Sequence, residues 1–318
     1  MTAQPLDEKL IFALGIDHRL DFCRELVGSG ERPTAAEREQ AASLKQVVFD
    51  GLVQAVEGGL PKSNALVWAD HDLGEGALLR ARAMSLPVAV SVEKPGTGLA
   101  GLSLESTADA WSALTRLDTP FAGVRTPYNF ADETPVKQDV QEQLRALASK
   151  CKEAARKLVI ELTPRPTAGQ LAGAGGTLTP VLRAQLLLEA MRELQDSGVE
   201  PSVWVVAPPQ EALAAATVSA QAHVDGRTGV TVLFEVGAEP DPGQITMGPS
   251  KADRAMARLA ARTAGTGGML VGPDAYFATL ARLHQGLVTR PDAVSSIGSH
   301  LKKLWELFDE ARRKSEVS

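Results

Sequence analysis

The sequence predicts a single-domain (β/α)8 (TIM) barrel over residues 1–318, with residues 1–9 and 312–318 as loose termini. Eight short runs rich in Val, Ile and Leu alternate with longer helical patterns. The runs are continuously apolar, as in parallel strands that are buried on both faces. A doubly wound open sheet is the alternative, but no GxGxxG follows the first run, and neither a P-loop nor a linker between two halves is present. Eight strand–helix units in a chain of this length therefore favour the closed barrel.

The eight expected strands are each followed by turn residues and a helical segment. They are Leu10–Asp17, Ala65–Asp70, Pro87–Lys94, Phe121–Thr126, Leu158–Thr163, Val203–Ala207, Gly229–Val236 and Gly268–Gly272.

The intervening helices have recognisable start signals. Thr34 followed by Glu37 is a capping box that opens a helix through Glu57. Weaker signals of the same kind, or a capping residue before a first-turn proline, occur at Ser106/Asp109, Ser250/Asp253, Thr134-Pro135 and Thr179-Pro180. The last helix, near Asp292–Lys314, carries an apolar stripe that we expect in the core, made of Ile297, Leu301, Leu304, Trp305 and Phe308.

Composition narrows the class of protein. The net charge of −6 argues against a nucleic-acid partner, and no run approaches the roughly 18 apolar residues that cross a membrane. Two cysteines, Cys23 and Cys151, cannot build a disulfide framework, and the first residues lack a signal-peptide pattern. We therefore expect a cytoplasmic protein with a small-molecule substrate; a homo-oligomer stays open.

Glycine-rich segments follow two of the strands. They are Pro95–Gly101 and Thr167–Gly176, and in a barrel they are either loops at the C-terminal face, where active sites form, or flexible connections.

Acids and bases gather at the predicted strand ends, which meet at the mouth of a barrel. The candidate catalytic residues are Asp17, Glu93, Lys94 and Glu161. The candidate substrate-binding residues are His18, Arg19, Asp70, Arg125, Tyr128 and Asn129.

Two further readings of these strand ends remain open. Lys94 is the one lysine that the sequence places at a strand C-terminus, where it is a phosphate contact, a partner of Glu161 or an amine nucleophile. Metal coordination would use oxygen and nitrogen atoms of Asp17, Asp70, His71, Glu93 and Glu161, but no ligand spacing such as HExxH supports it. We therefore assign no metal ligand and expect no cofactor.

Four segments carry a family resemblance from about Leu10 to Phe308. They are FALGIDHRLDF (Phe12–Phe22), LPVAVSVEKPG (Leu86–Gly96), IEL around Glu161, and RELQDSGVEPSVW (Arg192–Trp204). Through them the chain resembles the aldolase domain fused to 5-dehydro-2-deoxygluconokinase in inositol catabolism, and more distantly tagatose-1,6-bisphosphate aldolases. The resemblance implies class I aldol chemistry on a phosphorylated sugar acid or ketose, with a Schiff-base lysine on strand six.

The chain departs from this family where the family's chemistry takes place. The residue after Trp204, where the family has its lysine, is Val205, which cannot form an iminium. On strand four Gly123 and Pro127 replace a lysine and an arginine, and the strand-eight glycine-arginine pair becomes Gly272-Pro273, which lacks a phosphate clamp.

Three alternative functions are compatible with these retained and lost residues. The first is an aldolase-like carbon–carbon lyase of altered mechanism that acts on a sugar or sugar phosphate. The second is a catalytically inactive barrel that binds a sugar or a partner, and the third is a metal-dependent lyase or isomerase. We expect Glu161 to lie within ion-pair reach of Lys94 inside the barrel mouth, and Lys94 to stay charged as an anion or carboxylate contact.

Overall fold

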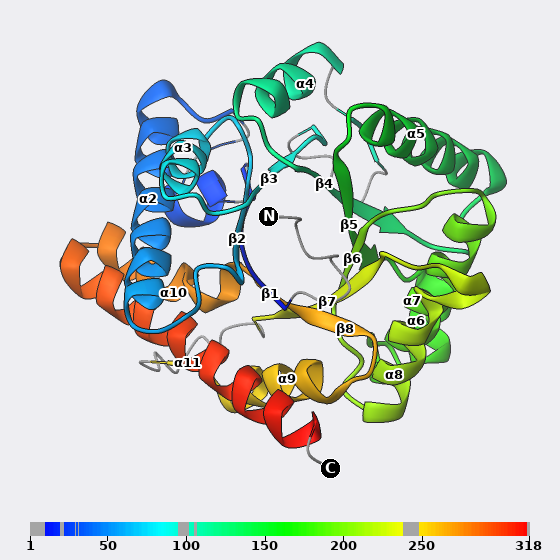
Figure 1. Ribbon diagram of the computed structural model, residues 1–318. Helices are drawn as coiled ribbons and strands as arrows, with labels where there is room; N and C mark the ends of the chain where they lie inside the picture. Colours follow the sequence, from blue (N-terminus) through cyan, green and yellow to red (C-terminus); the bar gives the residue numbers. More distant parts are fainter. Residues whose placement is uncertain are drawn as a thin grey trace.

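The structure is a closed barrel of eight parallel strands in the order β1 to β8, surrounded by helices (Figure 1). It is a computed structural model that describes residues 10–19, 22–28, 30, 32–94, 102–104, 107–237 and 248–316. The strands are β1 (Ile11–Ile16), β2 (Ala65–Ala69), β3 (Val88–Ser91), β4 (Phe121–Tyr128), β5 (Lys157–Pro164), β6 (Val203–Val206), β7 (Thr231–Val236) and β8 (Thr266–Val271). Each overlaps one predicted run, so the predicted fold class is confirmed.

The helices that cover the barrel follow the strands in chain order. They are α2 (Ala35–Glu57), α3 (Glu75–Ala83), α4 (Thr107–Arg116), α5 (Thr134–Glu153), α6 (Ala168–Gly173), α7 (Pro180–Asp196), α8 (Ala212–Gln221), α9 (Lys251–Arg262), α10 (Phe277–His284) and α11 (Arg290–Glu316), with short turns η2 (Cys23–Val27), η4 (Val224–Gly226) and η5 (Pro273–Ala275).

Three of the predicted helix N-caps are confirmed, and one lies one residue earlier than predicted. Thr34, Thr179 and Ser250 each accept a hydrogen bond from a first-turn backbone N–H, as predicted. Helix α5 instead begins at Thr134 and has Glu133 as its N-cap, which places Pro135 in the first turn, where its missing N–H costs nothing. The Ser106 signal lies outside the described residues.

Two expectations about connections change. The glycine-rich segment Thr167–Gly176 contains helix α6, because Thr167 and Gln170 form a capping box that the sequence reading overlooked. The C-terminal segment is helical up to Glu316, and Arg312 donates hydrogen bonds to the carbonyl oxygens of Ala261 and Thr266. The segment Pro95–Gly101 and residues 1–9 lie outside the described residues.

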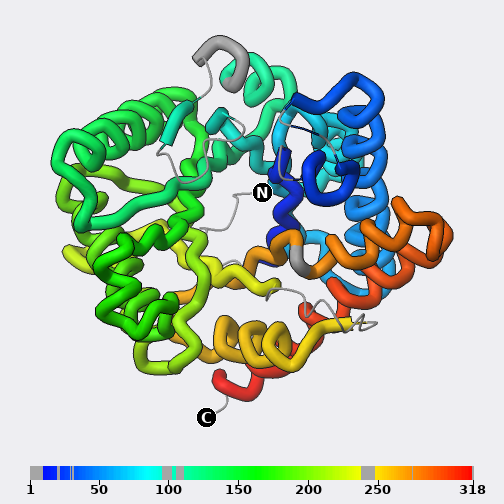
Figure 2. The backbone as a smooth tube through the Cα atoms, turned by 180° about the vertical axis from the view of Figure 1, so that it is seen from behind, coloured from blue at the N-terminus to red at the C-terminus, as the bar shows by residue number. Residues whose placement is uncertain are grey.

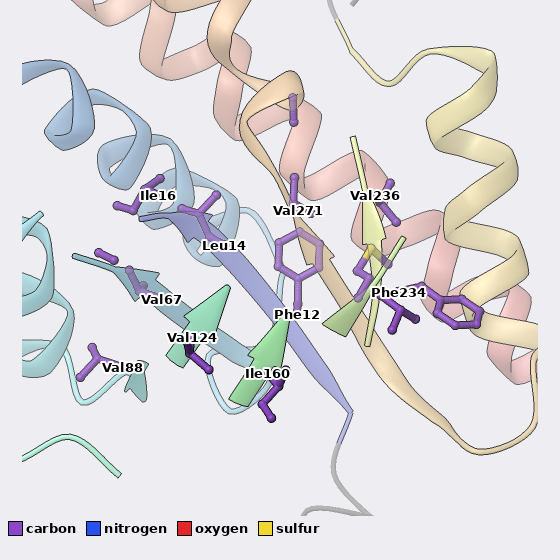
Figure 3. Packing of buried hydrophobic residues seen from close by; sticks show 14 of the residues in the cluster. Phe12, Leu14, Ile16, Val67, Val88, Val124, Ile160, Phe234, Val236 and Val271 are labelled. Atoms are coloured by element: carbon purple, nitrogen blue, oxygen red, sulfur yellow. The ribbon is translucent and has the colours of Figure 1, made fainter. Parts of the chain in front are cut away.

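The core has two apolar layers. The outer layer lies between the strands and the helices, and Figure 3 shows part of it, including Phe12, Val124 and Phe234. Helix α11 packs against α2 and α9 (Figure 2), and the predicted stripe through Leu301 and Phe308 is buried there. The inner layer fills the barrel itself, so the barrel has a packed floor beneath its mouth. No helix in the described ranges is long and apolar enough to cross a bilayer.

Candidate functional site

Alternate residues on each strand point into the barrel, and their character changes along the strand. The lower inward positions are apolar and form the inner layer, made of Ile11, Ala13, Leu66, Trp68, Ala89, Phe121, Val159, Val203, Val205, Leu233 and Leu270. By the same alternation, the charged residues at inward C-terminal positions are Asp17, Glu93, Arg125, Glu161 and Glu235, together with Asp70 after β2, which is paired with Lys45 at the edge of this group. The candidate site is this polar ring above the apolar floor, which we call the mouth.

Arg125 lies at the centre of the mouth and ties its two sides together. Its Nε and Nη2 donate to the two carboxylate oxygens of Glu161, at 2.6 and 3.1 Å. Its Nη2 also reaches Oδ1 of Asp17, the residue directly after β1, at 3.4 Å. The side chain is 26% exposed, and within the described residues Nη1 has no hydrogen-bond partner. The Nη1 group of this partly exposed guanidinium can therefore bind an oxygen atom of a ligand.

Two carboxyl groups beside Arg125 have pKa values shifted in opposite directions. Burial, the largest single effect, would raise the pKa of Asp17, but Arg125 together with Lys45 and other neighbouring groups outweighs it and holds this pKa below its usual range. Burial, together with the neighbouring charge of Asp17, raises the pKa of Glu93 to about 8. Asp17 Oδ2 and Glu93 Oε2 are buried, and neither forms a hydrogen bond with any residue that the structure describes. At neutral pH the mouth thus holds an ionised carboxylate and a protonated carboxylic acid.

Glu161 and His18 complete the electrostatics. Burial raises the pKa of Glu161, and Arg125 opposes this. Burial and the nearby Arg125 lower the pKa of His18 to about 3, so its ring, 3.6 Å from Asp17, is neutral at physiological pH. His18 therefore contributes polarity rather than charge.

The expected pairing of Glu161 with Lys94 is wrong. Of the side chains that the structure describes, Arg125 forms the ion pair with Glu161. Lys94 lies beyond the end of β3 with an exposed side chain, and its backbone N–H bonds to the carbonyl oxygen of Ser103. The desolvation that a neutral amine nucleophile requires is absent at this exposed position.

Arg19 and Asp70 belong to a buried network next to the mouth. Lys45, on α2, is fully buried and donates to Asp70 and to the carbonyl oxygen of Ile16. Arg19 lies 3.9 Å from Asp70 and donates to the backbone carbonyl oxygen of Glu93 at 2.9 Å. These groups are engaged with protein atoms.

Tyr128 and Asn129 lie away from the mouth. Tyr128 is three residues after Arg125, so it points outward, and its hydroxyl bonds to Glu193 on α7 and to Gln141 on α5. Asn129 donates to the carbonyl oxygen of Arg165 and to Gln170, both at 2.6 Å, and so fixes the connection after β4. The structure thus brings together, in or directly beside the mouth, seven of the ten predicted site residues, namely Asp17, His18, Arg19, Asp70, Glu93, Arg125 and Glu161.

One mouth residue, Glu235, and one residue of the adjoining network, Lys45, were not predicted from the sequence. Lys45 interrupts the buried stripe of α2 at helical spacing from Ala41 and Val48, which is a detectable signal. Glu235 is two residues after the inward Leu233, and a Cβ added to Gly272 would lie 2.9 Å from its Oε1, so the carboxylate rests against the end of β8. Alternation within β7 would have identified it.

Val205, which the sequence resemblance aligns with a Schiff-base lysine, is part of the apolar floor. It is fully buried and lies in register with Glu161 on one side and Leu233 on the other. In the described ranges, no group of three or more His, Cys, Asp or Glu side chains could hold a metal ion. Asp70 is instead paired with Lys45, and Asp72 with Arg38. The described donor atoms thus give the metal hypothesis no support.

The fold and the mouth define a (β/α)8 barrel with an acidic, arginine-centred mouth. A family model described as "Uncharacterized protein conserved in bacteria (DUF2090)" matches residues 1–252, most of the chain. The chain belongs to this DUF2090 family. Comparison with curated protein sequences gave no match.

Solved structures of fructose-bisphosphate aldolases share the fold. A Schiff-base-forming fructose-1,6-bisphosphate aldolase is 15% identical, with a TM-score of 0.52 over 88% of this chain and 94% of that one. An archaeal fructose-1,6-bisphosphate aldolase, with its catalytic lysine bound to a carbinolamine intermediate, is 15% identical, with a TM-score of 0.56 over 94% of each chain. The aldolase from Slackia heliotrinireducens is 13% identical, with a TM-score of 0.54 over 95% of this chain and 86% of that one. At such identities the likeness shows the fold alone.

Proposed function

We propose that this protein is a carbon–carbon lyase of the aldolase type that acts on a hydroxylated carbonyl compound by acid–base chemistry, without a Schiff base. The observation that carries the proposal is the pair of carboxyl groups beside Arg125 with pKa values shifted apart, below the usual range for Asp17 and to about 8 for Glu93. Such a pair supplies a base and an acid at the same pH.

The roles follow from these protonation states. Asp17 removes the proton of a hydroxyl group β to the carbonyl, and the carbon–carbon bond breaks as that oxygen becomes an aldehyde. The electron pair moves into the second fragment as an enol, whose oxygen takes the proton of Glu93 and bonds to Arg125 Nη1. Transfer of the Asp17 proton to carbon and return of the enol proton to Glu93 regenerate both groups.

The substrate class is a sugar or a sugar phosphate. Hydroxyl groups donate readily to carboxylates, and the mouth offers those of Asp17, Glu161 and Glu235. The structural neighbours are named for fructose 1,6-bisphosphate, which makes ketose phosphates the first probes. We extend the proposal to a role in inositol catabolism, which the resemblance implies, and to a cytoplasmic location.

The test is turnover and proton exchange with named probes. Fructose 1,6-bisphosphate, tagatose 1,6-bisphosphate and 5-dehydro-2-deoxygluconate 6-phosphate are incubated in D2O, and NMR follows cleavage and α-proton exchange. Asp17→Asn and Glu93→Gln should each lower a measured rate by about 10²- to 10⁴-fold. Glu142→Gln, at an exposed position of α5, is the control and should keep the rate. A rate that survives both mouth substitutions would refute these roles.

Val205 favours a second candidate, a barrel that binds a sugar without turning it over. Calorimetric binding of the same three probes to the wild type, without cleavage or exchange, would support this candidate and contradict the lyase. Loss of that binding in Arg125→Met would place the bound sugar in the mouth.

A further inference from the structure

A chain of buried polar contacts joins helix α2 to three consecutive strand ends. Lys45 Nζ donates to the carbonyl oxygen of Ile16, at 2.7 Å, and to Asp70 Oδ2. Asp70 Oδ1 accepts the backbone N–H groups of Asp72 and Leu73, at 2.9 and 2.5 Å. Both charged side chains are fully buried. This pair is therefore a fixed point between β1 and β2, and its opposite charges compensate each other.

Arg19 extends the chain from this fixed point to β3. Its Nε lies 3.9 Å from Asp70 Oδ1, and its Nη2 donates to the carbonyl oxygen of Glu93 at 2.9 Å. The residue is only 7% exposed. Because a guanidinium is planar, a carboxylate at one edge also fixes the direction of the N–H groups at the other edge. A flexible ammonium group has no such fixed geometry.

Glu93 needs such support because the strand ladder ends before it. Strand β3 stops at Ser91, and its pairing with β4 ends at Ser91 and Gly123. Beyond that, an isolated antiparallel bridge to Leu104 holds Glu93 from the other side. Among the residues that the structure describes, Arg19 supplies the side-chain contact to the Glu93 backbone.

We propose that Arg19, anchored by the buried Lys45–Asp70 pair, is a positioning residue that holds Glu93 inside the mouth. Arg19 acts on the backbone of Glu93 and leaves its carboxyl group directed at the ligand. This inference rests on the proposed function for its catalytic meaning, because Glu93 is the acid there. The geometry itself can be tested without turnover.

The test is a ¹³C NMR titration of protein labelled at the glutamate carboxyl carbons, with the Glu93 signal assigned by its loss in Glu93→Gln. In the wild type, burial raises the pKa of Glu93 to about 8, while the charge of Arg19 lowers it. If Arg19 acts only as a nearby charge, Arg19→Gln raises the midpoint further. If Arg19 positions Glu93, the released side chain reaches water and the midpoint falls toward 4.5, the ordinary glutamate value. We expect the fall.

Two variants separate positioning from charge. Arg19→Lys keeps the charge without the planar fork and should lower the midpoint less than Arg19→Gln. Lys45→Met/Asp70→Asn removes the anchor as a neutral pair and keeps the oxygen that accepts from Asp72 and Leu73, so the fold should survive and the midpoint should fall. Arg38→Gln, which removes the exposed partner of Asp72 from the same turn, is the control and should leave the midpoint unchanged.

An unchanged or raised midpoint in folded Arg19→Gln or in the folded double variant would overturn the proposal. Where a probe is turned over, the pH profile should shift in the same direction in Arg19→Gln, with kcat reduced and KM unchanged. If no probe is turned over by the wild type, the proposed function fails while the titration still decides the role of Arg19.

Discussion

Arg125 and Glu161 are direct register partners on neighbouring strands β4 and β5, and their side chains are joined by two hydrogen bonds. The pair therefore spans one strand spacing within the mouth and needs no loop to bring it together. Asp17 joins from β1, across the barrel interior. The guanidinium thus compensates carboxylates from two sides of the mouth.

Removing Arg125 should destabilise the protein strongly. In Arg125→Met, Glu161 and Asp17 lose their buried counter-charge, so we expect a loss of about 3–5 kcal/mol in the free energy of unfolding measured with urea. Arg125→Met/Glu161→Gln should lose less than the sum of the single variants, with a coupling of about 1–3 kcal/mol. The exposed pair Lys314–Glu310 on α11 is the control, and its cycle should give less than about 1 kcal/mol. Additive losses at Arg125 and Glu161 would contradict the pairing.

Stability should fall as pH rises because of Glu93. Burial raises the pKa of Glu93 from 4.5 to about 8, so the folded protein keeps a proton that the unfolded chain loses. This contribution is complete below pH 4.5 and disappears by about pH 8. The wild type should therefore lose stability relative to Glu93→Gln across this window, with a slope of at most about 1.4 kcal/mol per pH unit in urea titrations. A difference that is flat from pH 5 to 8 would show that Glu93 is ionised.

Borohydride should trap no adduct on strand β6. With 5-dehydro-2-deoxygluconate 6-phosphate, mass spectrometry of the peptide around Val203–Pro208 should show no added mass, because the chain has no amine there. Val205→Lys, if it folds, serves as the positive control for trapping. An adduct on Lys94 near neutral pH, ahead of the other lysines, would instead restore a class I mechanism with a relocated amine.

Gly123 should not tolerate a side chain. A Cβ atom at this position would collide with the indole of Trp68, including Cζ2 at 2.7 Å. We expect Gly123→Ala to lose about 1–3 kcal/mol of unfolding free energy. Gly123→Ala/Trp68→Phe should lose less than the sum of the two single changes. Wild-type stability in Gly123→Ala would show that the indole moves freely.

The sequence was sufficient for the strands because their apolar runs are continuous and their turns are clear. It was also sufficient for Asp17, Glu93 and Glu161, since each follows or lies within a run at an inward position. The prediction that Tyr128 lies in the mouth is wrong. Tyr128 is near the end of a strand, but the two-residue alternation along that strand turns its side chain outward, toward α7. The start of helix α5 differs from the prediction because Glu133 rather than Thr134 is its N-cap, and helix α6 was not predicted because capping residues also occur in loops.

The pairings within the mouth were beyond the sequence. Glu161 had both Lys94 and Arg125 as available cations, and only the register between β4 and β5 selects Arg125. Lys45 acts from a helix that lies outside the barrel, so its contact with Asp70 depends on how α2 packs against β1 and β2. Such contacts depend on how segments far apart in the chain pack against each other, and no local pattern in the sequence indicates that packing.

The contact between Trp68 and Gly123 also limits which chemistry can be engineered into the barrel. The indole of Trp68, bonded to Ser91 at 2.9 Å, occupies the interior space into which a side chain at position 123 would project. A lysine introduced at position 123 alone would therefore have to displace this indole. An engineered amine on β4 requires a paired change at Trp68, or the amine has to come from elsewhere in the barrel.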